Sequence, residues 1–278
     1  MKPGLHLVAT PIGHLGDLSP RALETLKAAD LVLCEDSRVT GKLLKLQGVE
    51  RSLHPYHEHN AARMRPRVLD HLARGESVAL TSDAGTPLVS DPGYKLVRDA
   101  IDAGHEVLTV PGPSAALAAL TVSGLPTDRF VFGGFLPSKS TARRRAIDVF
   151  SGVPTTLIWF ESAKRLASTL ADLEGVLGPR PAAVARELTK AFEEVKRGRL
   201  DELASTYAES DPPRGEIVIV VGPPDASSAL GEDELDAALR DALASKSPSA
   251  AAAAVAACLL YTSPSPRDQR GSRMPSSA

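Results

Sequence analysis

The sequence predicts an α/β protein in which one α/β unit is followed by a second. Three observations lead to this prediction. Short apolar runs alternate with helical patterns, the alternation occurs twice, and the turns after the apolar runs are rich in Gly, Pro, Asp and Ser. Strands that alternate with helices favour a sheet covered by helices on both faces. Ligands of such sheets bind where the strands end, so these turns are the first place to look for a site.

Four apolar runs predict the strands of the first unit. A helix is expected after Ser19, because Ser19 suits an N-cap and Pro20 the first helical position. A second helix over Lys95–Ala103 ends at Gly104. The predicted strands are Leu5–Ala9, Leu31–Cys34, Val78–Thr81 and Glu106–Val110.

The second unit repeats the pattern after Pro111-Gly112-Pro113. Its run Glu216–Val221 is almost continuously apolar, which is typical of a central buried strand. The other predicted strands are Phe130–Phe132, Thr155–Phe160 and Ala182–Ala185, and the predicted helices are Ala142–Phe150, Ala163–Leu177 and Leu200–Tyr207. We therefore expect domains at residues 1–112 and 113–224, and a truncated helical segment at 225–257 that begins with a helix at Glu232–Ala244.

The composition fits a globular protein of this kind. The chain has 278 residues, of which 43% are hydrophobic and 24% charged, which excludes a disordered chain and a small disulfide scaffold. No apolar run approaches the roughly 20 residues that cross a bilayer, and no signal-peptide core follows Met1. We expect a cytoplasmic protein without a membrane partner. The net charge of −2 alone gives no indication of a nucleic-acid partner.

Residues 258–278 are interpreted as foreign to the natural protein. Cys258–Asp268 resembles the translation of a transposase sequencing adapter, and Arg273–Ala278 that of the flow-cell adapter which follows it. The alternative is a disordered Pro/Ser/Arg tail. The segment carries a net charge of +2, so that −4 remains for the rest of the chain. Cys34 is then the one remaining cysteine, which excludes an intrachain disulfide and suits a reducing compartment.

Three loops are the strongest candidates for ligand binding. They are 9–17, 82–93 and 110–115, and each combines Gly and Pro with polar residues. Gly lets the backbone approach a ligand closely and Pro keeps it stiff. The alternative is that all three are merely tight turns. None matches a dinucleotide-binding or P-loop motif, so a standard site of either kind is not expected.

Two further segments carry polar side chains of interest. Asp36 and Arg38 follow the strand Leu31–Cys34 and could orient a polar substrate, or else begin a helix whose dipole the acids offset. The segment HPYHEHN (54–60) has the wrong spacing for an H-E-x-x-H zinc site. If it is extended, His57 and His59 share one face. We expect a polar cluster against substrate or the other domain, and no metal.

Basic residues gather in the second half of the chain, whereas the acidic loops lie in the first. A solvated helix face is the usual explanation for such runs. The asymmetry would also suit a ligand cleft with one phosphate-binding wall.

Eight segments resemble the ribosomal RNA small-subunit methyltransferase I family of the tetrapyrrole-methylase fold group. The resemblance covers roughly residues 4–222, and the segments follow one another in the family's order. They are TPIGHLGDLSPRALETL, LCEDSRVTGKLL, YHEHN, LTSDAGTPLVSDPG, VPGPSAALAAL, SGLPTDRFVFGGFLP, RELTKAFEE and RGEIVIVV.

The resemblance implies two α/β/α domains with S-adenosyl-L-methionine bound in the cleft between them. It implies 2′-O-methylation of a cytidine ribose in the decoding region of 16S ribosomal RNA, within the small ribosomal subunit, by a homodimer. Because the 2′-hydroxyl distinguishes RNA from DNA, we expect no activity on DNA.

The resemblance also implies roles for individual residues. The cofactor is expected along Pro11, Asp83, Ala84, Gly85, Val89, Ser114, Ala115, Phe160 and Ala185. The RNA is expected along Arg38, Arg143, Arg144, Arg165 and Arg186. The ribose hydroxyl must lose a proton, for which the base candidates are Asp36, His57 and Glu187, with Lys190 as a further catalytic residue.

Two other functions stay open at this point. One is methylation of a porphyrin-like small molecule, because the fold group is shared. The other is a ribosome-assembly factor without catalytic activity.

Overall fold

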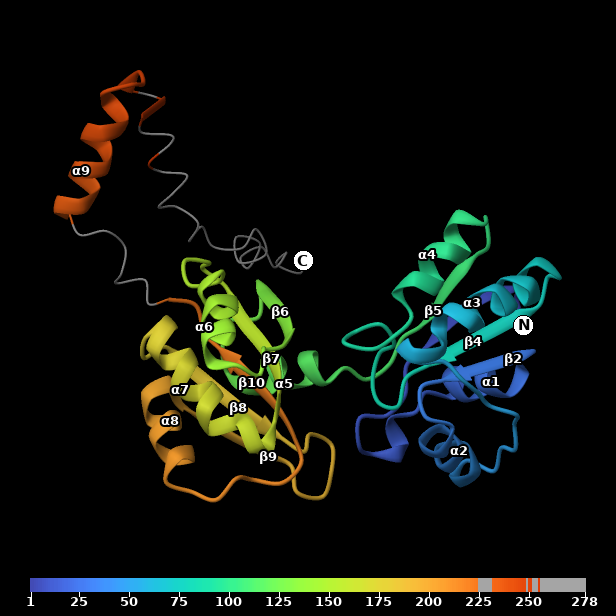
Figure 1. Cartoon of the computed structure of the whole chain (residues 1–278). Coiled ribbons are helices and arrows are strands. Elements are labelled where there is room, and N and C mark those ends of the chain that lie inside the picture. The colour runs from blue at the N-terminus through green and yellow to red at the C-terminus, as the bar shows by residue number, and fades with distance from the viewer. Residues whose placement is uncertain (225–231, 249, 252–254, 256–278) are drawn as a thin grey trace, which may run out of the picture.

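The computed structural model describes residues 1–224 and 232–248, together with residues 250, 251 and 255. Residues 1–224 form two lobes, each built on one five-stranded sheet (Figure 1). The predicted α/β fold is therefore confirmed. In the part of the chain that is described, no helix combines the length and the apolar character needed to cross a membrane. The tail 258–278 lies outside the described residues, as does much of 225–257, in which α9 (Glu232–Leu243) is described.

The first lobe is a parallel sheet covered on both faces. Its strand order is β3-β2-β4-β1-β5, and every neighbouring pair is parallel. One core packs the sheet against α3 and α4, and a second core packs it against α1 and α2. The strands are β1 (Gly4–Val8), β2 (Leu31–Cys34), β3 (His54–Pro55), β4 (Ser77–Thr81) and β5 (Val107–Val110). The helices are η1 (Leu15–Asp17), α1 (Pro20–Ala28), α2 (Ser37–Leu46), α3 (Glu58–Ala73) and α4 (Tyr94–Asp102).

Polar side chains begin two of these helices. The Ser19 hydroxyl accepts a hydrogen bond from the Ala22 amide at 3.1 Å, which confirms the predicted start of α1. At the start of α2, the Asp36 carboxylate accepts a hydrogen bond from the Arg38 amide at 2.8 Å. Such caps satisfy amide groups that have no partner within the helix.

The second lobe is a mixed sheet of order β6-β7-β10-β8-β9. Only β6 and β7 pair in parallel, and the other pairs are antiparallel. Helix α5 covers one face, whereas α6, α7 and α8 cover the other. The strands are β6 (Phe130–Phe135), β7 (Thr156–Ser162), β8 (Pro181–Arg186), β9 (Glu194–Arg199) and β10 (Glu216–Val221). The helices are α5 (Ala115–Ser123), α6 (Ser140–Asp148), η2 (Ala163–Arg165), α7 (Leu166–Leu177) and α8 (Leu200–Ala208).

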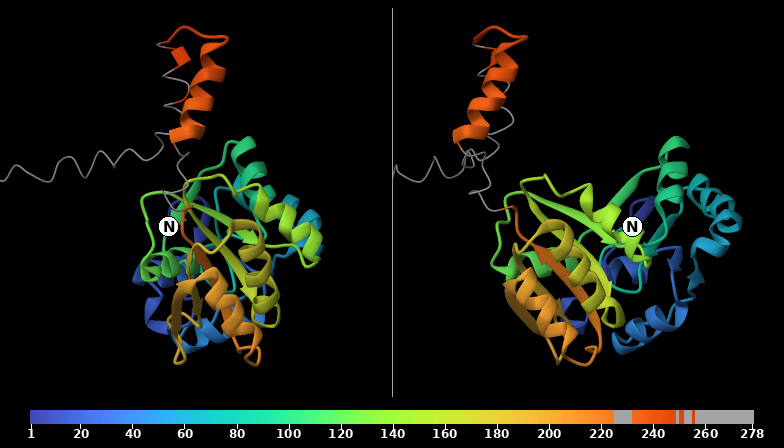
Figure 2. Two further views of the ribbon diagram at one scale, coloured as in Figure 1. Left: turned by 90° about the vertical axis from the view of Figure 1, so that its left-hand side faces the viewer. Right: turned by 60° about the vertical axis from the view of Figure 1, so that its left-hand side comes forward.

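The chain passes from one lobe to the other through residues 111–114, between β5 and α5. The domain limits 1–112 and 113–224 remain a proposal, with which this passage agrees. Figure 2 shows the two lobes from two further directions. They also meet through the loop after β1, where the Ile12 side chain is buried in the core of the second lobe, among residues of α5, β7, β8 and β10.

A buried ion pair joins α6 to α7. The Arg143 guanidinium lies 2.6 Å from the Asp172 carboxylate, and the Arg143 side chain is only 4% exposed. Asp172 also accepts a hydrogen bond from the Ser140 hydroxyl at 2.9 Å, and Arg143 donates to the Ser168 carbonyl at 3.3 Å. Removal of one partner from such a pair leaves a desolvated charge without compensation.

Arg143→Ala should therefore lower the free energy of unfolding by about 3–5 kcal/mol. The measurement is urea or thermal unfolding followed by circular dichroism. Arg145→Ala removes an exposed cation from the same helix and should leave stability nearly unchanged. Equal effects of the two changes would contradict the structural role of Arg143.

Candidate active site

The three predicted loops meet at the carboxyl ends of β1 and β4. Thr10 and Gly85 exchange two backbone hydrogen bonds of 2.9 and 3.1 Å, and the Thr86 hydroxyl donates to the Pro113 carbonyl at 3.1 Å. Gly85 has a φ of +80°, and a β-carbon there would lie 3.3 Å from Ile12. The loops are therefore one connected surface.

This surface forms one wall of a cavity of about 460 Å³ that both lobes line. The volume lies in the range of roughly 300–1,000 Å³ that holds small-molecule ligands. The first lobe, the passage and the first residue of α5 contribute Ile12, Asp83, Ala84, Gly85, Thr86, Val89, Ser90, Asp91, Ser114 and Ala115. The second lobe contributes Phe135, Phe160, Glu161, Ser162, Ala163, Gly215, Glu216, Ile217 and Val218.

Most of the residues predicted to bind the cofactor line this cavity. Two do not. Pro11 lines the neighbouring groove, and Ala185 is buried in β8, where it pairs with Val218 of β10, a residue that does line the cavity. Those that line it are Asp83, Ala84, Gly85, Val89, Ser114, Ala115 and Phe160.

Asp91 and Phe135 are among the residues of the cavity that the sequence prediction did not include. Asp91 belongs to the same loop as Asp83, so the second aspartate of that loop was the available signal. Phe135 stands on the edge strand β6 and packs against Phe160, with ring centroids 5.5 Å apart. No pattern in the sequence distinguished Phe135 from a core residue.

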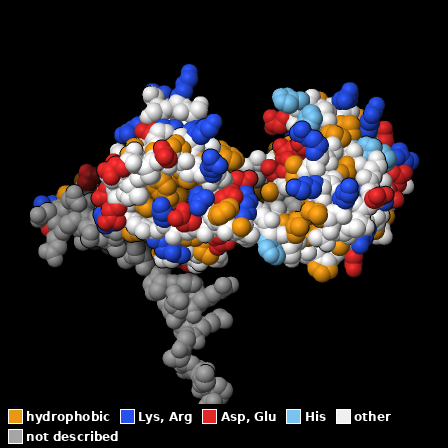
Figure 3. All heavy atoms as spheres, turned by 90° about the horizontal axis from the view of Figure 1, so that it is seen from below, with side chains coloured by type: hydrophobic (Ala, Val, Ile, Leu, Met, Phe, Trp, Pro, Cys, Tyr) orange, Lys and Arg blue, Asp and Glu red, His pale blue; other side chains and the backbone are white. Residues whose placement is uncertain are grey.

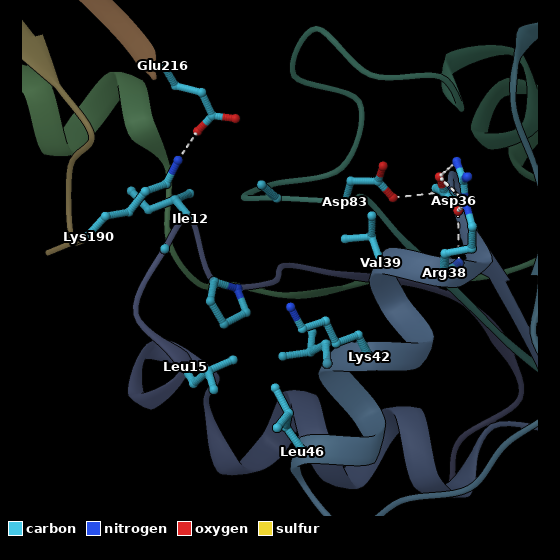
Figure 4. A pocket seen from close by; sticks show the side chains of 14 residues that line it. Ile12, Leu15, Asp36, Arg38, Val39, Lys42, Leu46, Asp83, Lys190 and Glu216 are labelled. Atoms are coloured by element: carbon cyan, nitrogen blue, oxygen red, sulfur yellow. Dashed lines mark hydrogen bonds and ion pairs between the residues drawn. The ribbon is translucent and has the colours of Figure 1, made fainter. Parts of the chain in front are cut away.

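A second, more open groove of about 780 Å³ adjoins the cavity (Figure 4). Ile12, Asp83, Ala84 and Glu216 line both spaces, so a molecule in one can touch a molecule in the other. The groove is also lined by Pro11, Gly13, Leu15, Asp36, Arg38, Val39, Lys42, Leu43, Leu46 and Lys190.

Carboxylates gather where the cavity and the groove meet. The Asp83 carboxylate accepts a hydrogen bond from the Asp36 amide at 2.9 Å, and burial raises the pKa of Asp83. Burial, helped by the charges of Glu35 and Asp83, raises the pKa of Asp91 to about 6. Burial and the charge of Asp83 also raise the pKa of Glu35. A raised pKa makes a carboxylate a better proton acceptor near neutral pH.

The predicted base candidates are less favourably placed than Asp83. Hydrogen bonds from the Arg38 side chain and amide lower the pKa of Asp36 to about 2. Hydrogen bonds from Lys190 and from the Glu216 amide lower the pKa of Glu187, which lines neither space. His57 also lies outside the lining of both. The segment 54–60 is extended only as far as His57, because α3 begins at Glu58.

Lys190 projects toward the junction from the loop between β8 and β9. Its ammonium lies 2.8 Å from Glu187 and 2.9 Å from Glu216 (Figure 4). Burial alone would lower the pKa of Lys190, but the hydrogen bonds to the two carboxylates outweigh burial and raise it. Lys190 is therefore held as a cation beside the cavity, between two carboxylates that offset its charge.

The same loop fastens the two lobes together. The Thr189 hydroxyl accepts a hydrogen bond from the His14 amide at 3.1 Å. A β-carbon at Gly13 would lie 2.5 Å from Lys190 and 2.7 Å from the Thr189 hydroxyl, so only glycine fits there. Glu187 and Thr189 hold φ values of +50° and +62°, which cost free energy for residues other than glycine.

Most of the arginines of the second lobe that were predicted to contact RNA form ion pairs with carboxylates of the same lobe. Arg143 is buried against Asp172, which corrects the expectation that it contacts RNA. Arg165 pairs with Glu161 at 2.9 Å, and Arg186 with Glu194 at 3.1 Å. Arg144 lies 3.5 Å from Asp172 and is half-exposed. On the face seen in Figure 3, cationic and anionic side chains mix on both lobes.

The cations of the first lobe lie closer to the junction. Arg38 is exposed and pairs with its neighbour Asp36 at 2.5 Å. Lys42 lies one turn later on α2, and no ion pair to it is found among the described residues. Both line the groove, so the groove has a positive rim on the α2 side.

Comparison with known families identifies this architecture. The family described as Tetrapyrrole (Corrin/Porphyrin) Methylases matches residues 4–204, so the chain belongs to the tetrapyrrole methylases. Within them it belongs to the ribosomal RNA small subunit methyltransferase I family. The protein of that name from Mesorhizobium japonicum is 54% identical over 258 residues, covering 92% of this chain and 87% of the relative. That from Escherichia coli O157:H7 is 46% identical over 219 residues, covering 78% and 77%.

Solved structures share the fold at low sequence identity. A diphthine synthase matches with a TM-score of 0.63 and 18% identity, covering 78% of this chain and 89% of the other. A uroporphyrin-III C-methyltransferase from Thermus thermophilus, complexed with S-adenosyl homocysteine, matches with 0.52 and 24%, covering 79% and 97%. The predicted family and fold class are confirmed.

Asp91→Asn should stabilise the protein more at pH 8 than at pH 5. The raised pKa means that ionised Asp91 destabilises the fold, and this cost grows as the pH rises from the ordinary value of 3.8 through about 6. Thermal melts at both pH values measure the difference, where 1 kcal/mol corresponds to roughly 2–4 °C. Asp70→Asn, at an exposed aspartate of α3, is the control. A gain that is equal at both pH values would refute the role of ionisation.

Proposed function

We propose that this protein transfers a methyl group from S-adenosyl-L-methionine to the 2′-oxygen of a cytidine ribose in the decoding region of 16S ribosomal RNA. The observation that supports it most is the pair of adjoining spaces: a ligand-sized cavity between the lobes, and an open groove that shares Asp83 with it. The names of the relatives supply the rRNA substrate and the small-subunit context.

The residues of the cavity suit the proposed cofactor. Asp83 and Asp91 offer negative charge to its sulfonium and ammonium groups, and the Phe135–Phe160 pair offers an aromatic surface to its adenine. The tight turn at Gly85 brings backbone close to the cavity. When bound, the cofactor supplies an electrophilic methyl group whose leaving group is a neutral thioether.

In this proposal Asp83 accepts the proton of the attacking ribose hydroxyl. It lines both spaces, and its raised pKa favours proton uptake. Lys190 keeps a positive charge near the oxygen as negative charge develops on it. The hydrogen bond from the His14 amide to Thr189 holds the two lobes in a fixed relative position. Such positioning matters because the alignment of the reacting groups supplies a large part of the rate in displacements of this kind.

The rest of the proposal follows from the same assignment. The substrate partner is the small ribosomal subunit, in the cytoplasm, and the enzyme acts as a homodimer. DNA is excluded as a substrate because it lacks the 2′-hydroxyl.

Primer extension after incubation of undermodified small subunits with the protein and S-adenosyl-L-methionine tests the proposal. A stop that is specific for 2′-O-methylation at one decoding-region cytidine is expected. Transfer of labelled methyl to a tetrapyrrole instead would favour the small-molecule alternative. Binding to subunits without any transfer would favour an assembly factor.

Replacement of the base candidates distinguishes their roles. Asp83→Asn should lower kcat by about 10²–10⁴-fold, the usual worth of a general base. Asp36→Asn should have a much smaller effect, because asparagine also caps a helix. His57→Gln and Glu187→Gln test the remaining two. Single-turnover methyl transfer to small subunits is the measurement, and a larger loss in any of these three than in Asp83→Asn would transfer the role to that residue.

A further inference from the structure

The groove beside the cavity has a feature that methyl transfer alone does not require. Three large aliphatic side chains on its walls are open to water: Leu15 is 42% exposed, Val39 44% and Leu46 57%. They come from two elements, η1 and α2, and Leu15 and Leu46 lie opposite each other in Figure 4. Contiguous exposed apolar surface in a groove marks a place where another molecule binds.

Positive charge accompanies this apolar surface. Arg38 and Lys42 stand four residues apart on α2, and Lys42 reaches across the groove in Figure 4. Asp83 marks the junction with the cavity, and Arg38 lies on that side of the groove, paired with Asp36, whose amide binds Asp83. The groove therefore has an apolar wall with Lys42 beside it and a charged end next to the proposed cofactor.

We propose that this groove binds a single unstacked nucleotide of an RNA strand. Its base lies on Leu15, Val39 and Leu46, its phosphates lie near Arg38 and Lys42, and its ribose points to Asp83. This inference rests on the proposed function and adds to it the position and the conformation of the substrate.

The chemistry of the groove favours this occupant. A nucleotide carries a flat apolar base and an anionic phosphate on one ribose, and the lining of the groove offers an apolar wall, the ammonium of Lys42 and the carboxylate of Asp83. Sequence-specific recognition of RNA mostly targets unstacked bases, which proteins place on aromatic side chains or Arg planes. In this groove the exposed aliphatic side chains would supply the apolar surface. A paired base would present only its edge, and the walls formed by Leu15 and Leu46 would remain uncovered.

The inference also explains why Lys42 of α2 is suited to the substrate, although Arg38 is paired with Asp36 and three arginines of the second lobe are paired within that lobe. Arg143, Arg165 and Arg186 each pair with a carboxylate of their own lobe. Lys42 has no such partner among the described residues and faces the groove. Phosphate contacts made by Lys and Arg position a strand and depend on salt.

The test is binding of a fluorescently labelled single-stranded RNA that carries the decoding-region sequence, followed by anisotropy, with the whole chain. Leu46→Asp and Val39→Asp place a negative charge on the apolar wall and should each weaken RNA binding about tenfold or more, the order of one base-stacking contact. Ile101→Asp, at an aliphatic side chain of α4 that is 54% exposed and outside the groove, is the matched control and should bind like the unchanged protein.

Two further measurements complete the design. Calorimetry with S-adenosyl-L-methionine should give the same affinity for all three variants, which shows that they are folded. RNA carrying 5-iodocytidine at the target position should cross-link to the peptide that contains residues 37–46. Unchanged RNA affinity in Leu46→Asp and Val39→Asp, or cross-links confined to the second lobe, would overturn the inference. RNA binding that depends on the groove, without methyl transfer to small subunits, would instead overturn the proposed function and leave the nucleotide groove standing.

Discussion

The burial of the Ile12 side chain in the second lobe determines how the two lobes together form a site. Ile12 follows the first strand of the first lobe, yet it is buried in the core of the second. It also lines both the cavity and the groove. Apolar burial is not directional, so the hydrogen bond from the His14 amide to Thr189 adds the orientation that Ile12 alone does not give. Both spaces therefore depend on the loop after β1.

Charged side chains are arranged differently in the cavity between the lobes and in the second lobe itself. Asp83 and Asp91, for which no ion pair is found among the described residues, line the cavity, where burial raises their pKa values. Three arginines of the second lobe, Arg143, Arg165 and Arg186, form ion pairs within that lobe, and Arg143 is the most deeply buried of them. A near-neutral total charge thus conceals a cleft rich in unneutralised carboxylates, and such a cleft favours a cationic ligand.

Much of the fold follows from the sequence, because strong patterns specify it. The strands Leu31–Cys34 and Glu216–Val221 were predicted with the bounds that the structure has, since both are continuously apolar and end at polar or Gly-Pro residues. Helix α5 was missed, because its residues are apolar on all sides and show no helical period. Strand β9 was missed because it is a charged edge strand (EVKRGR) without an apolar face. Antiparallel pairing in the second sheet depends on long-range contacts that no local pattern reports.

The candidate site was predictable in its loops but not in its electrostatics. The sequence motifs of the loops pointed to Asp83, Gly85 and Ser114, and all three line the cavity. Whether a charged side chain is free or paired depends on neighbours distant in sequence, as Asp172 is for Arg143 and Glu194 is for Arg186. For that reason the ion pairs of Arg143 and Arg186 could not be predicted from the sequence.

Because there is no room for a side chain at Gly13, the two halves of this protein cannot be freely combined with those of homologous proteins. The chain crosses between the lobes once, at residues 111–114, which makes this the obvious joint for a chimera of two homologous genes. However, the loop around Gly13 belongs to the N-terminal half and the loop around Thr189 to the C-terminal half, and the two loops are in close contact. The two halves are therefore exchangeable only if residues 12–14 and 187–190 descend from the same parent.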